Sequence, residues 1–345
     1  MKSLNTAIVI LNWNGEHFLR KFLPGVIACS KGIARIVIAD NDSSDDSLKV
    51  LSEFGNDIEV IKLDKNYGFT GGYNRALKLV DAEYYVLLNS DVEVTTGWIE
   101  PIINFMTANA DVAACQPKIR SYADRHLFEH AGASGGYIDW LGYPFCRGRL
   151  FLSLEEDHQQ YNSTTEIFWA TGACMFVRAS VFHQMNGFDE EFFAHMEEID
   201  LCWRMQIGGY KIMSIPESEV YHVGGGTLPK TNPRKTFYNF RNNLMMLQKN
   251  LPGHQAWVII PIRLVLDGVA GVKFMLDGDF SDTLAVIKAH FAFYASIPKR
   301  LKIRKEIQQN LHNSKFKGVY HGSILKAYYL KGLKHFSQLN QQKFS

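Results

Sequence analysis

The stretch YYVLLNSD at residues 84–91 joins a short apolar run to a polar, acidic end. A run of this kind suits a strand of a parallel sheet that is covered on both faces. Three comparable runs come earlier in the chain, AIVIL at 7–11, RIVIA at 35–39 and EVIKL at 59–63. Helical patterns separate the four runs, at residues 16–29, 44–54 and 71–80. Strands that alternate with helices predict an α/β fold with a mostly parallel central sheet.

Polar or acidic side chains follow each predicted strand, which is the edge where ligands bind in parallel α/β sheets. One such cluster is usually a turn or a helix cap, but four successive clusters predict a common crevice. The residues that we expect along this edge are Asn12, Trp13 and Asn14, then Asp40 and Asp42, then Asn66, Gly71, Gly72 and Asn74, and finally Asn89 and Asp91.

Asp91 is a candidate ligand for a divalent cation. An acid just beyond a buried strand can hold Mg²⁺ or Mn²⁺ against a diphosphate, and Mg²⁺ needs only one or two protein carboxylates. His222 follows a predicted strand at 211–215 and is a candidate second ligand, which would favour Mn²⁺. Read alone, a histidine in this position is more often structural.

A predicted helix at 197–208 carries a second group of charged side chains. Glu197, Asp200 and Arg204 share one face through spacings of three and four residues, which would also suit an ion pair between Asp200 and Arg204. Glu198 lies instead on the apolar face. Burial there would raise its pKa toward the range of a general base that deprotonates an acceptor hydroxyl.

The C-terminal third differs in composition from the rest of the chain. Residues 256–276 are apolar but contain three charged residues, so they make a poor membrane-spanning helix. Residues 285–297 are apolar and precede a basic cluster at 299–305, which is the pattern of an in-plane membrane anchor. The alternative is a pair of core helices with a solvated basic end.

The distribution of charge favours an anionic partner for this region. From Thr283 onward, 12 Lys or Arg residues accompany a single acid, Glu306, whereas the rest of the chain is net acidic. The adjacent apolar stretch favours a membrane over nucleic acid, for which no recognised motif is present.

The composition, 46% hydrophobic and 21% charged residues, is that of an ordinary globular protein. The five cysteines lack paired short spacing, which favours a reducing compartment over a disulfide framework. No signal peptide is expected before the first strand. We therefore predict a cytoplasmic chain, located at the inner face of the cytoplasmic membrane. The predicted domains are a catalytic α/β domain at 1–250 and a helical, basic region at 251–345.

A succession of motifs runs from residue 12 to residue 243. They are NWNG at 12–15, ADNDSSDDS at 39–47, KNYGFTGGYNRAL at 65–77, LLNSDVEV at 87–94, TGACMFVR at 171–178, GFDEEFFAHMEEIDLCWR at 187–204, VYHVGGGT at 220–227 and FYNFRNN at 237–243. In this order the motifs resemble the family 2 glycosyltransferases, especially the rhamnosyltransferase-like members of bacterial polysaccharide assembly. The resemblance covers about residues 6–243.

The resemblance implies a GT-A fold and an inverting single displacement. The donor would be a dTDP- or UDP-sugar, with rhamnose one candidate sugar, and the acceptor a glycan or lipid-linked glycan. It further implies that Asp40 hydrogen-bonds the nucleobase and that residues 12–14 line the nucleotide pocket. By the same resemblance, the residues that approach the donor would be Asn66, Gly71, Gly72 and Asn74.

The resemblance also assigns the metal and the base. Asp91 matches the last acid of the family's metal motif, whose first position is Asn89 in this chain, and His222 matches a histidine that contacts metal or diphosphate. The family's usual Glu-Asp pair is Glu197-Glu198 here, so Glu198 is the expected base and Glu197 the alternative.

Three other classes fit the sequence less well. A sugar-phosphate nucleotidyltransferase would need a Gly-rich, basic loop after the first strand, and a nicotinamide oxidoreductase would need a G-x-G-x-x-G turn there. NWNGEHF at 12–18 provides neither. A non-catalytic binding module would keep the fold without the chemistry, against which the retained acids and histidine argue.

Overall fold

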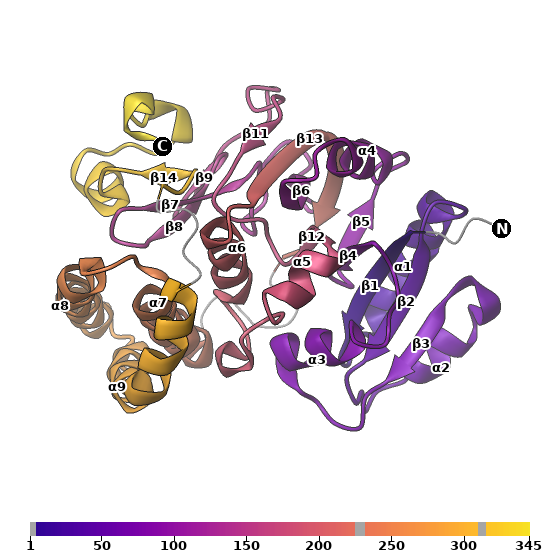
Figure 1. Cartoon of the computed structure of the whole chain (residues 1–345), viewed down its shortest axis with the longest axis horizontal. Helices are drawn as coiled ribbons and strands as arrows, with labels where there is room; N and C mark the ends of the chain where they lie inside the picture. Colours follow the sequence, from indigo (N-terminus) through magenta and orange to yellow (C-terminus); the bar gives the residue numbers. More distant parts are fainter. Residues whose placement is uncertain (1–4, 225–231, 310–314) are drawn as a thin grey trace.

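A curved central sheet carries the predicted strand ends (Figure 1). The computed structural model describes residues 5–224, 232–309 and 315–345, so Gly225–Thr227 of the VYHVGGGT motif lie outside the described residues. The sheet has the order β11-β13-β6-β12-β4-β1-β2-β3, with β5 beside β13. Its strands are β1 Thr6–Asn12, β2 Arg35–Asp40, β3 Glu59–Lys62, β4 Tyr84–Leu88, β5 Val92–Val94, β6 Val112–Ser121, β11 Thr165–Glu166, β12 Cys174–Arg178 and β13 Lys211–His222.

The sheet is mixed, whereas the sequence predicted a mostly parallel one. The four strands that the sequence located, β4-β1-β2-β3, are parallel neighbours. The next strand, β12, is antiparallel to both β4 and β6. The strand predicted at 211–215 is also longer than expected. It continues past Pro216 to His222 through a shift of register between Ile215 and Glu219, and such an irregularity tolerates a residue without an N–H group.

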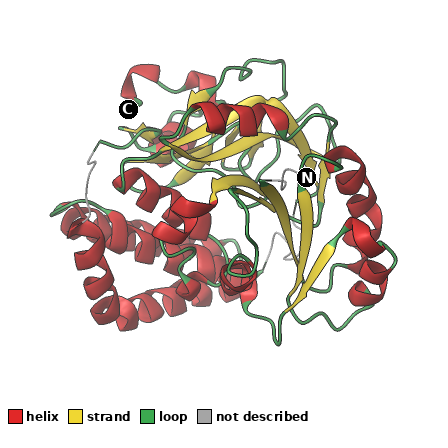
Figure 2. Cartoon of the chain, turned by 45° about the vertical axis from the view of Figure 1, so that its right-hand side comes forward, coloured by secondary structure: helices red, strands yellow, loops and turns green. Residues whose placement is uncertain are grey.

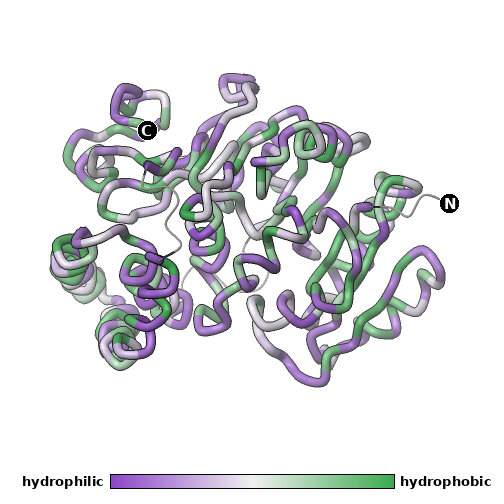
Figure 3. Tube along the Cα trace, viewed as in Figure 1, coloured by the Kyte–Doolittle hydropathy of each residue, from purple (hydrophilic) through white to green (hydrophobic). Residues whose placement is uncertain are grey.

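Alternate residues of the central strands enter two cores on opposite faces of the sheet, as the period of a strand requires. Ala7 and Val9 lie in one core, and Ile8 and Ile10 lie in the other. The first core contains side chains of α3, α5 and α6, and the second contains those of α1, α2 and α4. Figure 2 shows helices on both sides of the sheet. In Figure 3, β1 and β2 are coloured mostly as hydrophobic, which agrees with the burial of both their faces. The helices are α1 Glu16–Ser30, α2 Ser47–Ser52, α3 Gly68–Ala76, α4 Glu100–Ala108, α5 Ala179–Gln184 and α6 Glu197–Ile207.

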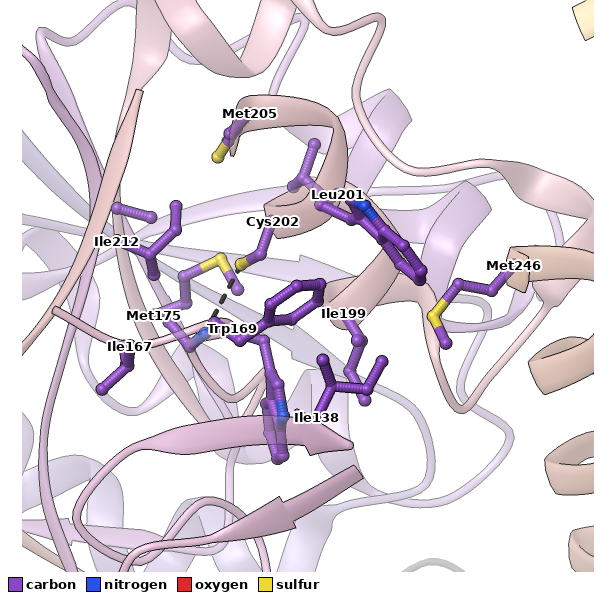
Figure 4. Close-up of a cluster of buried hydrophobic side chains, with 14 of the residues drawn as sticks. Ile138, Ile167, Trp169, Met175, Ile199, Leu201, Cys202, Met205, Ile212 and Met246 are labelled. Carbon is purple, nitrogen blue, oxygen red and sulfur yellow. Dashed lines mark hydrogen bonds between the residues drawn. The ribbon is translucent and has the colours of Figure 1, made fainter. Parts of the chain in front are cut away.

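Helix α6 is fixed by one of these cores. Figure 4 shows Leu201, Cys202 and Met205 of α6 among side chains from the sheet, including Met175 and Ile212. All five of these side chains are buried. The packing orients the first turn of α6, which carries the candidate base.

The C-terminal region is helical only in part, in contrast to the prediction for 251–345. Helix α7 (Pro233–Asn250) leads to α8 (Gln255–Leu276) and α9 (Phe280–Gln309), which lie together at one end of the molecule (Figure 1). Residues 315–345 then return to the α/β part of the molecule, which is called the catalytic half below and comprises residues 5–224. There β14 joins the parallel edge of a second small sheet, of order β10-β9-β8-β7-β14. This sheet consists of β7 Gly136–Asp139, β8 Pro144–Cys146, β9 Arg149–Leu150, β10 Ser153–Leu154 and β14 Val319–Tyr320. The domain boundary at residue 250 stays a prediction.

Helices α7 and α9 are joined to the catalytic half by buried charges. Arg300 of α9 is fully buried, and its Nη2 lies 2.6 Å from Glu191 Oε2. Lys249 of α7 lies 2.7 Å from Asp189 Oδ2 and 2.8 Å from Asp200 Oδ2. Burial alone would raise the pKa of Asp189, but Lys249 and Arg300 outweigh it and hold this pKa below its usual range. These contacts connect α7 and α9 to the segment that leads into α6.

Replacing Arg300 by methionine should destabilise the protein. Arg300→Met leaves the carboxylates of Asp189 and Glu191 with less compensating charge, so the free energy of unfolding should fall by about 3 kcal/mol. Urea titration followed by circular dichroism measures this change. The matched control is Arg20→Met, because Arg20 pairs with Glu16 and Glu53 at the surface and should contribute little. Equal unfolding midpoints for the two variants would contradict the structural role of Arg300.

Candidate active site

The ends of β1 and β2 form one polar cluster. Asn12 Nδ2 donates to Asp40 Oδ1 and to Ser43 Oγ, each at 3.1 Å, and the Ser43 N–H donates to Asp40 Oδ2 at 3.1 Å. Asn14 Oδ1 accepts from the Ser44 N–H at 2.7 Å. The Asn12 Oδ1 atom is buried and has no hydrogen-bond partner in the described parts of the chain. The first two strand ends therefore meet, as predicted, and leave an acceptor atom for a ligand.

Two of the residues predicted at this edge, Trp13 and Asp42, are exposed to solvent. Trp13 is 46% exposed, and Asp42 is exposed with a positive φ of 63°. An exposed indole beside a nucleotide pocket is able to stack on a base.

Asn41 connects the second strand end to the third, and the sequence analysis missed it. Its Nδ2 donates to Asn66 Oδ1 and to the Gly68 carbonyl, each at 3.1 Å, and its Oδ1 accepts from the Tyr67 N–H at 3.0 Å. The available signal was its place between the two acids of ADND.

Gly71, Gly72 and Asn74 have structural contacts that differ from the donor contacts expected of them. A Cβ on Gly72 would lie 2.7 Å from Leu11, so this glycine lets α3 pack closely on β1. Gly71 is likewise buried. Asn74 donates to the Phe188 carbonyl at 2.8 Å and accepts from the Phe188 N–H at 2.9 Å. Asn74 thus secures the segment that precedes α6.

Asp91, His222 and Glu129 form a buried chain at the fourth strand end. The pairing of β5 with β13 sets Val92 opposite His222, which brings the neighbouring Asp91 to the histidine. His222 Nε2 lies 3.2 Å from Asp91 Oδ1, and His222 Nδ1 lies 3.1 Å from Glu129 Oε2. Asn89 completes this edge, because its N–H donates to the Ala173 carbonyl at 3.0 Å.

His222 and the two carboxylates beside it stabilise one another electrostatically. Burial would lower the pKa of His222, but its bonds to Asp91 and Glu129 outweigh burial and raise the pKa to about 10. Burial would raise the pKa of Glu129, and the bond to His222 lowers it overall. Glu129 also accepts from the Ala131 N–H. No pattern in the sequence marks Glu129 as a site residue, because it lies in the irregular middle of the chain.

Asp91 and His222 fit a divalent cation that is shared with a ligand. Across residues 5–224, 232–309 and 315–345, no three His, Cys, Asp or Glu side chains lie together as a metal site. Asp91 Oδ1 and His222 Nε2 are nevertheless adjacent, and a cation bound between them would take the place of the Nε2 proton, because an imidazole ligates a metal only in its neutral form. A cation held by two protein ligands leaves positions for phosphate oxygens and water.

The backbone before α6 is held in an unusual conformation. Phe193, His195 and Met196 have positive φ angles of 63°, 69° and 73°. Asn242 of α7 donates to the carbonyls of Ala194 and His195, each at 2.8 Å, and thereby fixes this turn. Left-handed non-glycine residues cost about 1–3 kcal/mol each and concentrate at functional sites.

Glu197 and Glu198 begin α6, and one carboxylate oxygen of each, the buried Oε2, lacks a hydrogen-bond partner in the described chain. Burial raises the pKa of Glu198 to about 7. Burial, together with the neighbouring Glu198, raises the pKa of Glu197 well above its usual range. Glu197 is buried, whereas Glu198 is partly exposed, so Glu198 is the more accessible base.

Asp200, which was predicted to share a helix face with Glu197, lies among buried polar side chains. It is fully buried and bonds Arg204 at 2.9 Å, Lys249 at 2.8 Å and Asn250 at 2.7 Å. The predicted pairing with Arg204 is therefore present, inside the protein rather than on its surface.

His195 is a further polar residue that the sequence analysis missed. Its Nε2 is buried without a partner in the described ranges, and burial, with a smaller effect of Lys235, lowers its pKa to about 4. It is therefore neutral at pH 7. Its position two residues before Glu197 was the only signal in the sequence.

Comparison with known proteins agrees with this geometry. Residues 7–185, just over half of the chain, match the family model described as glycosyl transferase family 2. An N-acetylglucosaminyl-diphospho-decaprenol L-rhamnosyltransferase of Mycobacterium tuberculosis is 23% identical over 282 residues, which cover 77% of this chain and 90% of the relative. The rhamnosyltransferase WbbL of Escherichia coli is 24% identical over 62% of this chain and 82% of its own.

Solved structures share the fold at low sequence identity. Residues 1–349 of S. aureus TarS, in complex with UDP-GlcNAc, have a TM-score of 0.56 and 13% identity, with 95% of this chain and 92% of that chain covered. GalNAc-T7 with UDP, GalNAc and Mn²⁺ has a TM-score of 0.57 and 15% identity over 74% of this chain, which spans half of that chain. These likenesses confirm the predicted GT-A fold.

Removing the carboxylate behind His222 should weaken metal binding. Glu129→Ala frees the His222 ring and its tautomer, so the affinity for Mn²⁺ in the presence of a nucleoside diphosphate should fall about 10–100-fold. Isothermal titration calorimetry or the Mn²⁺ EPR signal measures this affinity without any turnover.

Glu129→Gln is the matched control, because the amide oxygen still accepts from Nδ1 and most of the affinity should remain. Unchanged Mn²⁺ affinity in a folded Glu129→Ala protein would show that Glu129 does not orient the histidine.

Proposed function

The chain belongs to glycosyl transferase family 2, and from this premise we propose that it is an inverting enzyme which moves a sugar from a dTDP- or UDP-sugar to a hydroxyl group of a glycan. The observation that carries the proposal is the buried Oε2 of Glu198, which has no hydrogen-bond partner in the described chain and belongs to a carboxyl group with a pKa of about 7 at the start of α6. The names of the rhamnosyltransferase relatives support rhamnose as the sugar.

The donor occupies the edge formed by the ends of β1 to β4 in this proposal. Asp40, held by Asn12 and Ser43, hydrogen-bonds the nucleobase. Trp13 covers the base from the exposed side of the pocket. The buried Oδ1 of Asn12 accepts a donor hydroxyl or N–H group.

Asp91 and His222 are the residues that would hold Mg²⁺ or Mn²⁺, which when bound would neutralise charge on the leaving diphosphate. The Mn²⁺ in the structures of GalNAc-T7 and of a mannosyltransferase from Pyrobaculum calidifontis supports a divalent cation of this kind. Within the chain itself, Glu129 keeps the His222 ring in one orientation, with Nε2 facing Asp91.

Glu198 acts as the general base and takes the proton of the acceptor hydroxyl as that oxygen attacks the anomeric carbon from the face opposite the leaving group. Its partly buried site keeps the carboxylate poorly solvated and therefore basic. Glu197 is the alternative base, because its Oε2 is also unpaired among the described side chains.

The acceptor in this proposal is a lipid-linked glycan at the cytoplasmic face of the membrane, where the chain makes peripheral contact with anionic lipid. The diphospho-decaprenol acceptor in the name of the mycobacterial relative supports the lipid link. The basic C-terminal region supports the contact with lipid. None of the helices in the described ranges has the length and hydropathy needed to cross a bilayer.

Glu198→Gln should lower kcat by about 10²–10⁴-fold while donor binding is retained, because the amide cannot accept a proton. In the wild type, kcat/KM should rise with pH through about 7, since Glu198 must be deprotonated to act. The variant should lose this rising limb. Rates of nucleoside diphosphate release across pH 5–9 test both effects.

Glu197→Gln separates the two candidate bases. If Glu198 is the base, this variant should keep most of the wild-type kcat and the rise of kcat/KM with pH. If Glu197→Gln lost turnover and the pH dependence while Glu198→Gln kept both, the base would be Glu197.

A screen of purified protein with dTDP-, UDP- and GDP-sugars, with and without Mn²⁺, tests the function as a whole. We expect metal-dependent release of nucleoside diphosphate from one donor class, accelerated by a lipid-linked acceptor. Absence of release from every donor, with no donor binding by calorimetry, would rule the proposed function out. Tight donor binding without turnover in the presence of acceptor would indicate a binding module.

A further inference from the structure

Helix α8 buries two of its three charged side chains and turns a stripe of apolar side chains outward, whereas its third charge, Lys273, is exposed. Arg263 and Asp267 are only 3% and 1% exposed, and they pair with each other at 3.5 Å. The outward residues recur at spacings of three and four along one face, and they are Val258, Ile262, Val265, Val269, Val272 and Leu276. Their exposed fractions run from 36% to 79%. A helix on the surface of a water-soluble domain normally has the reverse arrangement.

Helix α9 repeats the pattern. Its large exposed apolar residues also follow spacings of three, four and seven, and they are Phe280, Leu284, Ile287, Phe291, Tyr294 and Leu301. The opposite side of α9 is buried through Ala285, Ala289 and Phe293. Both helices show hydrophobic turns in Figure 3, at the end of the molecule away from β1–β3.

The two helices pack on each other through their inner sides. Asp267 lies 3.5 Å from His290, and Thr283 donates to the Gly271 carbonyl at 3.0 Å. We call the two exposed stripes together the outer face of α8 and α9. No described part of the chain covers these twelve side chains. An exposed apolar surface of this extent marks an interaction site.

The charged side chains beside the outer face indicate which kind of partner can bind it. Lys288, Lys302 and Lys305 of α9 are exposed, and from Thr283 to Gln309 this helix has six Lys or Arg residues against one acid, whereas Asp277, Asp279 and Asp282 lie at the turn between α8 and α9. A second copy of the same face would bring two basic surfaces together, which costs energy. An anionic bilayer offers apolar chains to the stripes and negative headgroups to the lysines.

We propose that the outer face of α8 and α9 is the membrane-docking surface, with both helices lying in the plane of an anionic bilayer. The proposal rests on the membrane location in the proposed function, and it names the residues that make the contact. It changes the sequence prediction as well, because α8, dismissed as a spanning helix, becomes part of the docking surface.

Flotation of the full-length protein with lipid vesicles tests the proposal. Wild type should bind vesicles that contain phosphatidylglycerol and bind phosphatidylcholine vesicles far less. The double variant Val269→Glu/Phe291→Glu places one carboxylate in each stripe and should lower the vesicle-bound fraction about tenfold or more. Both positions are exposed, at 62% and 69%, so the fold should be retained, as thermal unfolding would verify.

Leu152→Glu is the matched control, because Leu152 is 84% exposed and lies outside α8 and α9. Its vesicle binding should equal that of the wild type. Equal binding by the double variant, or no binding by the wild type, would overturn the proposal. So would a wild-type dimer in light scattering that the double variant breaks, since a second copy would then occupy the face.

Failure of this proposal is distinguishable from failure of the proposed function. Donor hydrolysis without vesicles should be the same in wild type and double variant, because the stripes lie outside the donor site. Vesicle binding without any donor turnover would refute only the function, and turnover without vesicle binding would refute only the docking surface.

Discussion

Two buried carboxylates, those of Asp189 and Asp200, impose the constraint on which the C-terminal half of the structure depends. A buried carboxylate is tolerated only when cations and hydrogen bonds replace its water. Lys249 of α7 contacts both acids, and Arg300 of α9 reaches Asp189. Helices α7 and α9 must therefore dock on the catalytic half for the segment before α6 to be stable. The C-terminal helices α7 and α9 therefore stabilise the segment that carries the candidate base.

That docking makes the conformation around the base possible. The turn before α6 holds Phe193, His195 and Met196 in the left-handed region, and the Asn242 side chain bonds two of its carbonyl groups. The core under α6 fixes the helix from the other side (Figure 4). The Oε2 atoms of Glu197 and Glu198 then remain buried without a hydrogen-bond partner within the described structure. The raised pKa of Glu198 is in this sense a property of its scaffold.

The sequence predicted what is local and missed what depends on register. Strands β1 to β4 were found because each is a short apolar run with a polar end. The antiparallel course of β12 was missed because an apolar run has no direction. The contact of Asp91 with His222 joins residues 131 positions apart through the pairing of β5 with β13. The sequence made each residue a candidate ligand by its place after a predicted strand, but no spacing predicted the contact between them. Glu129 lies in irregular chain without periodicity, and Asn74 has the residue type of a ligand-binding side chain but bonds the backbone of Phe188.

Helix α9 links the two surfaces on which the proposed reaction depends. Its outward stripe includes Phe291 and faces the bilayer in our proposal, whereas Arg300 on its inward side bonds Asp189 and Glu191, a few residues before Glu198. Because Arg300 is fully buried, these bonds cannot exchange with water as surface ion pairs do. The height of the base above the membrane is then set by one packed helix. In the proposed reaction with a lipid-linked acceptor, a rigid connection of this kind would hold the base at a constant position relative to the membrane that carries the acceptor.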